Sequence, residues 1–210
     1  MEPSDVSREA RAALFVRFPE AQTGLTTFHD LLATSGVERG LIGPRETPRL
    51  WDRHLVNCAV VSELIPVGHR VADVGSGAGL PGLVLALVRP DLVVTLIEPL
   101  ARRSSFLEEA VRELNLGERV DVIRGRAQDQ PAGTYDTVTS RAVAPLERLS
   151  SWCLPLVKPG GQVVAIKGAR AHEEVTAARG SLPMGVEVNV RVCGVDVIDP
   201  PTTVVTLVMG

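Results

Sequence analysis

The stretch of this sequence with the most chemical content is a glycine-rich segment at residues 73–82, which reads DVGSGAGLPG. It follows a short apolar run and precedes an apolar segment with helical spacing, so we expect it to connect a strand to a helix. Glycines at such a turn let a ligand approach the backbone, and the free N–H groups of the following helix suit an acceptor-rich ligand. Glu98 ends the next apolar run, where a carboxylate can accept hydrogen bonds from ribose hydroxyls. These residues predict a cofactor site.

Two cofactor classes fit this turn. The segment GAGLPG at 77–82 matches the G-x-G-x-x-G pattern of dinucleotide sites, with Glu98 roughly 20 residues further on. The segment DVGSGAG at 73–79 matches the acid-x-G-x-G-x-G pattern of class I S-adenosylmethionine methyltransferases. The second reading is favoured because the strand most naturally ends near Val74, and because Asp73 suits a ligand with an ammonium and a sulfonium. A turn that uses glycine for geometry alone is the remaining alternative.

The elements that must position this turn follow from hydrophobic periodicity. Residues 4–18, 27–35 and 46–65 have helical spacing, with Ser4 as a cap. Strands are then predicted at 71–74, 92–97, 120–123, 135–140 and 162–167, with helices at 81–88, 100–116 and 145–156. The β-branched runs at 186–197 and 204–209 predict a C-terminal hairpin.

This order defines the predicted fold class. Alternating strands and helices are typical of a parallel α/β sheet, to which the hairpin adds an antiparallel strand. We therefore predict an α/β protein with the Rossmann-like, mostly parallel sheet of class I methyltransferases. An N-terminal helical extension would cover residues 1–66, and the methyltransferase domain would cover residues 67–210.

Composition excludes several classes of protein. The chain has 210 residues, of which 45% are hydrophobic and 22% charged, so it can form an ordinary core and is not a disordered protein. No apolar run reaches the ~18 residues of a membrane span, and the acidic N-terminus lacks the apolar core of a secretory signal. With a net charge of −3 and 3% aromatic residues, it is neither a strongly basic protein nor an aromatic base-stacking platform.

Histidine and cysteine positions argue against metal and thiol chemistry. The four histidines lack the i, i+4 pairing of a zinc-binding helix, and the three cysteines form no C-x-x-C pair, so no metal is predicted. Separated cysteines also suggest a reducing compartment, and we expect the protein to be cytoplasmic. Cys153 lies in an apolar helical segment with nothing nearby to activate its thiol, so we expect it in the core.

A basic stretch runs from residue 141 to residue 172, where Glu147 is the acid among the cations. Its cations are Arg141, Arg148, Lys158, Lys167 and Arg170. Such a stretch is most often a solvated surface. Several of its members follow predicted strands, however, and α/β sheets bind ligands at that edge, so phosphates are an alternative partner.

Several segments resemble one known family. They are RHL at 53–55, DVGSGAGLPGLVLALVRPD at 73–91, RRSSFLEEAVREL at 102–114, SRAVAPLERLSSW at 140–152 and KPGGQVVAIKG at 158–168. Together they are similar to the small-subunit ribosomal RNA guanine-N7 methyltransferases of the RsmG (GidB) family. The sequence departs from the family at Asn57 and Cys58, where the family often has Asp-Ser.

The resemblance implies S-adenosylmethionine as cofactor, and 16S ribosomal RNA or the small ribosomal subunit as the partner of a monomeric enzyme. It assigns cofactor binding to the turn, the ends of the next strands and Arg141, which also meets the target base. The implied cofactor residues are Gly75, Gly77, Leu80, Glu98, Ala127, Gln128 and Arg141. The implied substrate-binding residues are Arg53, His54, Arg102 and Lys167.

Methyl transfer to guanine N7 needs no general base, since this nitrogen has a free lone pair and no proton. Arg141 would then act in catalysis by orienting the reactants, and the base would have to be unpaired or extruded from its stack. Two other functions stay open. One is an NAD-dependent reductase on the same glycines, although Tyr135, the one tyrosine, forms no Tyr-x-x-x-Lys pair. The other is a non-catalytic RNA-binding module on this fold.

Overall fold

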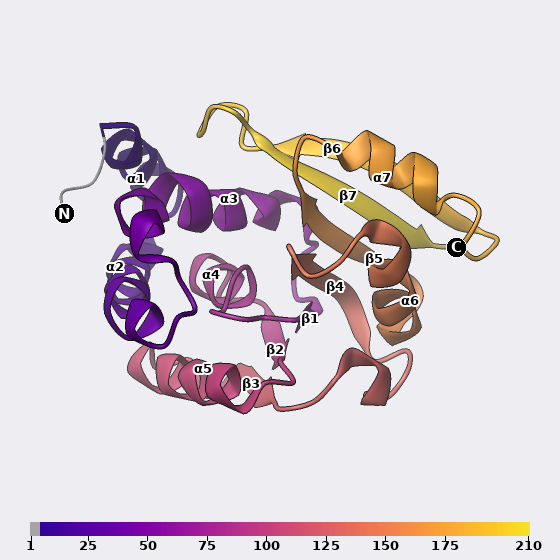
Figure 1. The fold of residues 1–210 in the computed structure, drawn as a ribbon, viewed down its shortest axis with the longest axis horizontal. Coiled ribbons are helices and arrows are strands. Elements are labelled where there is room, and N and C mark those ends of the chain that lie inside the picture. Colours follow the sequence, from indigo (N-terminus) through magenta and orange to yellow (C-terminus); the bar gives the residue numbers. More distant parts are fainter. Residues whose placement is uncertain (1–4) are drawn as a thin grey trace.

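The computed structural model describes residues 5–210, which contain a seven-stranded sheet (Figure 1). Its strands are β1 Arg70–Val74, β2 Val93–Ile97, β3 Val120–Ile123, β4 Tyr135–Arg141, β5 Val157–Lys167, β6 Val186–Cys193 and β7 Thr202–Met209. The strand order is β3-β2-β1-β4-β5-β7-β6; the pairs among β1 to β5 are parallel, and β7 runs antiparallel to both β5 and β6. The predicted parallel sheet with an antiparallel hairpin is confirmed, and β1 ends at Val74 as predicted.

The α-helices are α1 Asp5–Arg17, α2 Gln22–Leu31, α3 Val56–Ala59, α4 Gly82–Val88, α5 Ala101–Glu113, α6 Leu146–Cys153 and α7 Ala171–Ala178. Tighter or wider helical turns extend several of them, including π-helical turns at Leu32–Gly36 and Trp51–Leu55. The predicted helix at 27–35 in fact starts at Gln22, and α7 was not predicted. The predicted cap at Ser4 lies outside the described residues. Across residues 5–210, no helix is both long and apolar enough to cross a membrane.

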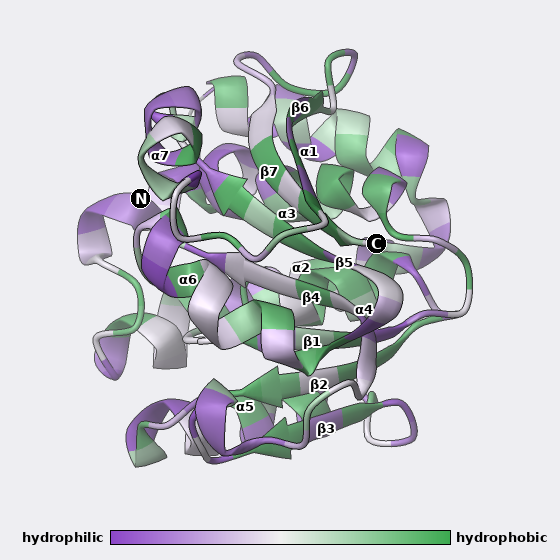
Figure 2. Ribbon diagram, turned by 90° about the vertical axis from the view of Figure 1, so that its right-hand side faces the viewer, coloured by the Kyte–Doolittle hydropathy of each residue, from purple (hydrophilic) through white to green (hydrophobic). Residues whose placement is uncertain are grey.

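The strands alternate between two apolar faces, as the period of two in a strand requires. On β5, Val164 and Ile166 face a core that also receives the N-terminal helices, α4 and α5. Val163 and Ala165 face a second core under α6 and α7. Figure 2 shows largely hydrophobic strands, whereas the helices that cover them carry hydrophilic segments. The sheet is therefore the middle layer of three.

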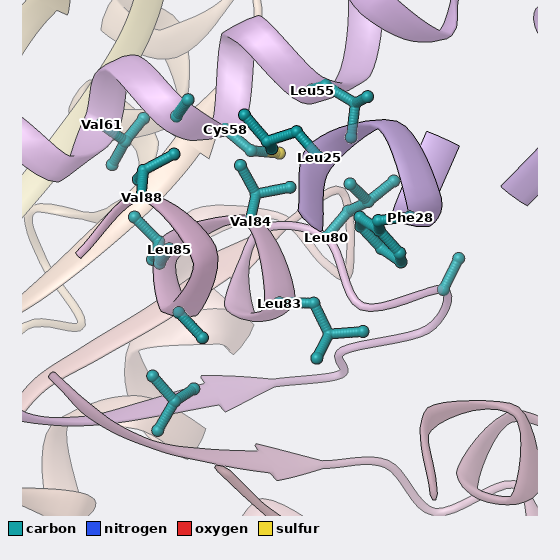
Figure 3. Close-up of a cluster of buried hydrophobic side chains, with 14 of the residues drawn as sticks. Leu25, Phe28, Leu55, Cys58, Val61, Leu80, Leu83, Val84, Leu85 and Val88 are labelled. Carbon is teal, nitrogen blue, oxygen red and sulfur yellow. The ribbon is translucent and has the colours of Figure 1, made fainter. Parts of the chain in front are cut away.

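The N-terminal helices pack against α4 through fully buried side chains (Figure 3). Leu25 and Phe28 of α2 meet Leu83 and Val84 of α4, and Cys58 of α3 lies in the same cluster. The last N-terminal helical turn ends at Leu64 and β1 begins at Arg70, while the division into an extension at 1–66 and a domain at 67–210 stays a prediction. Because the helices and the sheet share one core, the N-terminal region is fixed relative to the edge of the sheet.

The turn between β1 and α4 is held by a buried carboxylate. Asp73 is fully buried, and its Oδ2 accepts a hydrogen bond from the backbone N–H of Gly82 at 2.9 Å. A Cβ at Gly82 would lie 2.7 Å from the same oxygen, so only glycine lets α4 approach the strand this closely. Burial raises the pKa of Asp73 to about 7, although the Gly82 hydrogen bond acts in the opposite direction.

This raised pKa predicts a pH-dependent stability. The unfolded carboxyl titrates near pH ~4, so between pH 4 and 7 the folded state binds more protons and the free energy of unfolding falls as pH rises. In Asp73→Asn this contribution is absent, while an amide oxygen can still accept from Gly82. Urea unfolding of both proteins from pH 4.5 to 7.5 should show the wild type losing stability relative to the variant.

Asp136→Asn is the matched control for that measurement. Hydrogen bonds from Lys158 and the backbone of Arg70 outweigh burial and lower the pKa of Asp136, so its titration lies below the same pH range. Its stability difference from the wild type should stay constant between pH 4.5 and 7.5. A constant difference for Asp73→Asn as well would contradict the raised pKa.

Candidate active site

A cavity of about 800 Å³ lies at the carboxyl edge of β1 to β4. Its walls include residues 74–78 at the end of β1, 97–100 at the end of β2, 125–128 after β3 and 141–143 at the end of β4. The N-terminal region closes one side with Leu41, Ile42 and His54. We call this space the first cavity. It occupies the position where parallel α/β sheets bind ligands.

The first cavity brings together every residue predicted to bind the cofactor. These are Gly75, Gly77, Leu80, Glu98, Ala127, Gln128 and Arg141. They come from four separate loops, so the topology of the sheet, rather than sequence proximity, unites them. Asp73 does not line the cavity, because its carboxylate is turned toward Gly82. Asp73 therefore stabilises the turn through Gly82 and does not itself line the cavity.

Glu98 is 1% exposed, and both of its carboxylate oxygens are oriented by backbone donors. Oε2 accepts from the N–H of Gly77 and Oε1 from the N–H of Leu100, each at 3.0 Å. Arg103 places its Nη1 3.8 Å from Oε2. A carboxylate offers about four acceptor positions, so lone pairs remain for two ribose hydroxyls. This fits the role predicted for Glu98.

Gly75 and Gly77 both have positive φ, of +70° and +57°, but different constraints act on them. A Cβ at Gly75 would lie 2.6 Å from Cγ2 of Val143, so the protein's own packing requires glycine there. A Cβ at Gly77 would meet no atom of the chain closer than 3.8 Å. Gly77 lines the cavity with space in front of it, as expected where a ligand approaches the backbone. The cavity thus fits a nucleoside-containing cofactor.

Arg141, at the end of β4, is anchored by the N-terminal region. Its Nη2 donates to Nδ1 of His54 at 2.7 Å and to the backbone oxygen of Arg53 at 3.1 Å. Its Nη1 donates to Sγ of Cys58 at 3.4 Å. Ala142, the next residue, has a φ of +55°, which is uncommon for a residue with a side chain. Arg141 is therefore held in one orientation at the edge of the sheet.

His54 is neutral at physiological pH. Burial, followed by the positive charge of Arg141, lowers the pKa of His54 to about 4. Since Nδ1 accepts from Arg141, the ring proton is on Nε2, which lies 3.2 Å from Oε2 of Glu46 and donates to it. The two partners together define a single tautomer.

A second cavity, of about 1000 Å³, adjoins the first. The two share Arg141, Ala142 and Val143 as lining residues. Its other walls come from residues 49–57 in the N-terminal region, from 166–170 after β5, from α7 and from the connection between β6 and β7. It is therefore a separate space that opens onto the same arginine.

The predicted substrate-binding residues have different surroundings. Arg53 lines the second cavity with a half-exposed side chain, 3.2 Å from Glu46. Lys167 also lines it but is buried, with Nζ 2.8 Å from both Glu174 Oε2 and the backbone oxygen of Ala144. Arg102 is exposed on α5 and lines neither cavity, whereas its neighbour Arg103 lines the first.

Sequence reasoning missed Arg103, Val143 and the acceptors of Arg141. The signal for Arg103 was present, since two arginines begin α5, but only the helical phase decides which one turns toward Glu98. Val143 gave no signal, because an isolated valine in a loop resembles any other. Cys58 was noted as a departure from the family, without its contact to Arg141.

Among residues 5–210, the other side chains that could act as nucleophiles or metal ligands are not placed for catalysis. Cys153 is fully buried in the core, as predicted, and this burial raises the pKa of its thiol to about 12. In the described part of the chain, no three His, Cys, Asp or Glu side chains gather in a way that could hold a metal ion.

Solved structures with the same fold are found among methyltransferases. A predicted O-methyltransferase from Agrobacterium tumefaciens superposes with a TM-score of 0.58 at 22% identity, covering 73% of this chain and 80% of that one. A precorrin-6y C5,15-methyltransferase from Geobacter metallireducens gives a TM-score of 0.54 at 16% identity, covering 74% of this chain and 88% of that one. The chain therefore has the fold of class I methyltransferases.

Sequence comparison identifies the family within that class. The family model for GidB, rRNA small subunit methyltransferase G, matches residues 21–196. The ribosomal RNA small subunit methyltransferase G of Salinispora tropica is 60% identical over 186 residues, covering 84% of this chain and 77% of that protein. The one from Kineococcus radiotolerans is 52% identical, covering 99% and 82%. The chain belongs to the rRNA small subunit methyltransferase G family, and its methyl donor is S-adenosylmethionine.

Gly77→Ala tests whether the turn contacts the cofactor. The added methyl group meets no protein atom at close range, so it should weaken binding of S-adenosylhomocysteine at least tenfold while the protein stays folded. Gly133→Ala is the matched control, since Gly133 has a φ of +59°, open space around it and no place in either cavity. Calorimetric titration compares the affinities. Equal affinity in both variants would mean that the Gly77 turn is only structural.

Proposed function

We propose that this protein transfers the methyl group of S-adenosylmethionine to N7 of a guanine in 16S ribosomal RNA, in the cytoplasm. The observation that carries the proposal is the junction of the two cavities at Arg141. One cavity has the acceptor and the glycine turn that a nucleoside cofactor needs. The other has room for a purine base. A single guanidinium lies where a donor and an acceptor of a methyl group would meet.

The residues that line the first cavity would contact different parts of the cofactor. S-adenosylmethionine supplies a methyl group on a sulfonium, which makes it electrophilic without further activation. Glu98 would accept hydrogen bonds from the ribose hydroxyls, since its carboxylate is already oriented by two backbone N–H groups. Gly77 lets the ligand reach the backbone, and Ala127 and Gln128 would flank the adenine.

The surroundings of the junction support an acceptor that needs no deprotonation. His54 is the titratable base nearest to Arg141 by hydrogen bonding, and its Nδ1 lone pair is already used by the guanidinium. Asp73 is buried behind the turn and does not line either cavity. Guanine N7 carries a lone pair and no proton, so positioning and exclusion of water are sufficient.

Arg141 would hold the target base by its O6 oxygen while leaving N7 open. The bidentate grip on O6 and N7 that arginine makes on DNA would block the reaction. Two of the donor atoms of Arg141 already bond to the N-terminal region, which limits how the guanidinium can turn toward a base. The second cavity would take the base after it leaves its stack, since N7 of a paired guanine lies in the deep major groove of RNA.

Cations at the rim of the second cavity would meet the RNA backbone. Lys167 and Arg49 are engaged by Glu174 and Asp52, each at 2.7–2.8 Å, so their charges are largely neutralised. Arg53 is half exposed and shares Glu46 with His54, which leaves it freer to turn outward. Arg170 lines the same cavity at the start of α7. We propose Arg53 and Arg170 as the phosphate contacts, and no such role for Lys167.

The two alternative functions lack support. A reductase would need a proton donor at the carboxyl edge of the sheet, but Tyr135, the one tyrosine, begins β4 at the opposite edge and is buried. A non-catalytic RNA-binding module would not require a cavity that unites the predicted cofactor residues. Ligand-dependent thermal shifts separate these functions: S-adenosylhomocysteine should stabilise the protein and NAD should not.

The direct test is methyl incorporation. The protein is incubated with labelled S-adenosylmethionine and either naked 16S RNA, 30S particles or 70S ribosomes, and digested nucleosides are identified by mass spectrometry. We expect 7-methylguanosine in at least one of these substrates. Incorporation at another base or atom would overturn the proposed target, and binding of S-adenosylhomocysteine without incorporation into any of the substrates would favour the binding module.

Arg141→Ala should lower the single-turnover rate of methyl transfer about 100-fold, because misplacing reactants by about an ångström has this effect. Arg141→Lys should recover little, since an ammonium cannot reproduce the planar fork. Arg112→Ala, on the exposed end of α5 and outside both cavities, is the control and should retain its rate. Full activity of Arg141→Ala would remove this residue from the site.

The wild-type rate of the chemical step should be nearly constant between pH 7 and 9. Guanine N7 needs no deprotonation, and arginine stays charged throughout this range. Single-turnover measurements with saturating RNA at several pH values test this. A steep rise with a midpoint inside the range would reveal a catalytic base and contradict the mechanism.

A further inference from the structure

Arg141 is held without a carboxylate. Among the described residues, its hydrogen-bond partners are all uncharged acceptors: an imidazole nitrogen, a backbone oxygen and a thiol sulfur. Arg49 and Arg53, which also line the second cavity, behave differently, since Arg49 pairs with Asp52 and Arg53 pairs with Glu46. A carboxylate would hold the guanidinium firmly but would also cancel its charge. Uncharged acceptors fix its direction and leave the charge available to a ligand.

The contact with His54 is the shortest of the three, at 2.7 Å from Nη2 to Nδ1. It is also the only one made by a side chain that is itself oriented by a further partner, because Nε2 donates to Glu46 at 3.2 Å. The side chain of His54 is 15% exposed, so the ring has little freedom to turn. A series of hydrogen-bonded side chains, Glu46, His54 and Arg141, therefore connects the N-terminal region to the carboxyl edge of β4.

Both ring nitrogens of His54 are used by these contacts. Nδ1 accepts from Arg141, and Nε2 carries the proton that Glu46 accepts. A neutral imidazole has one donor and one acceptor, so no hydrogen-bonding group remains for RNA. This differs from the substrate-binding role that the family resemblance implied for this residue.

We infer that His54 is a positioning residue: the Glu46–His54 pair orients the guanidinium of Arg141 at the junction of the two cavities, and His54 affects methyl transfer through Arg141 rather than by touching the RNA. This inference rests on the proposed role of Arg141 in catalysis. It gives the N-terminal helical region a part in catalysis itself, because the acceptors for a residue of β4 all come from residues 53–58.

A double-mutant cycle tests the inference. His54→Leu alone should lower the single-turnover rate at saturating RNA by about tenfold or more, which is the scale of a hydrogen bond to a charged donor. In the Arg141→Ala background the same substitution should add almost nothing, since the group that it positions is gone. RNA affinity, measured separately by filter binding, should change little in His54→Leu.

Two further variants separate the two sides of the ring and guard against a folding defect. His54→Asn can place an acceptor near the Nδ1 position and should recover a large part of the rate lost in His54→Leu. His54→Gln extends its amide toward Glu46, lacks that acceptor, and should recover little. Thermal unfolding of both should be similar, so a difference in rate between them reports the Arg141 contact rather than stability.

The possible results distinguish the inference about His54 from the proposed role of Arg141. Rate losses that multiply in the double variant, or a weaker RNA affinity in His54→Leu, would mean that His54 meets the substrate directly and would overturn the inference. Equal rates in His54→Asn and His54→Gln would overturn it as well. A fully active Arg141→Ala would instead refute the proposed role of Arg141, whatever the His54 variants do.

Discussion

The close approach of α4 to β1 at Gly82 is the constraint on which the rest of the structure depends. A side chain there would strike Asp73 and Leu96, so the helix can lie against the sheet only because this residue is glycine. The approach lets the carboxylate of Asp73 accept from the first N–H of α4, which fixes the turn that lines the first cavity. The opposite face of α4 then receives the N-terminal helices, whose buried leucines and phenylalanine make one core with it (Figure 3).

Because that core is shared, residues far apart in the sequence meet with fixed geometry. Residues 53–58 reach the end of β4 and provide the acceptors for Arg141. In a protein where the N-terminal helices were only tethered, the same contacts would cost the ordering of a whole segment. Here the packing of α2 and α3 on α4 has already ordered it, so hydrogen bonds to uncharged acceptors are enough to orient the guanidinium.

The sequence was informative where a local rule decides the structure. Hydrophobic alternation predicted the strands of the parallel sheet, and the glycine pattern located the end of β1 at Val74. The same rules could not find α7, a short helix with two acidic residues in its first turn and only a few buried positions. They also could not decide between Arg102 and Arg103, or show that Asp73 faces Gly82. Those outcomes depend on helical phase and on tertiary contacts, which a single sequence does not display.

The distribution of charge around the site connects this geometry to its chemistry. The two carboxylates nearest the turn both accept hydrogen bonds from backbone N–H groups, Asp73 through Oδ2 from Gly82, and Glu98 from Gly77 and Leu100. Neither forms a close ion pair with Arg141, whose partners are uncharged. A site built this way offers one cation at the junction and no free base beside it. That arrangement suits an acceptor atom that already has its lone pair, and it is poorly suited to one that must first lose a proton. The preference for a nitrogen such as guanine N7 can therefore arise from the absence of a free base at the junction as much as from the groups that bind the target.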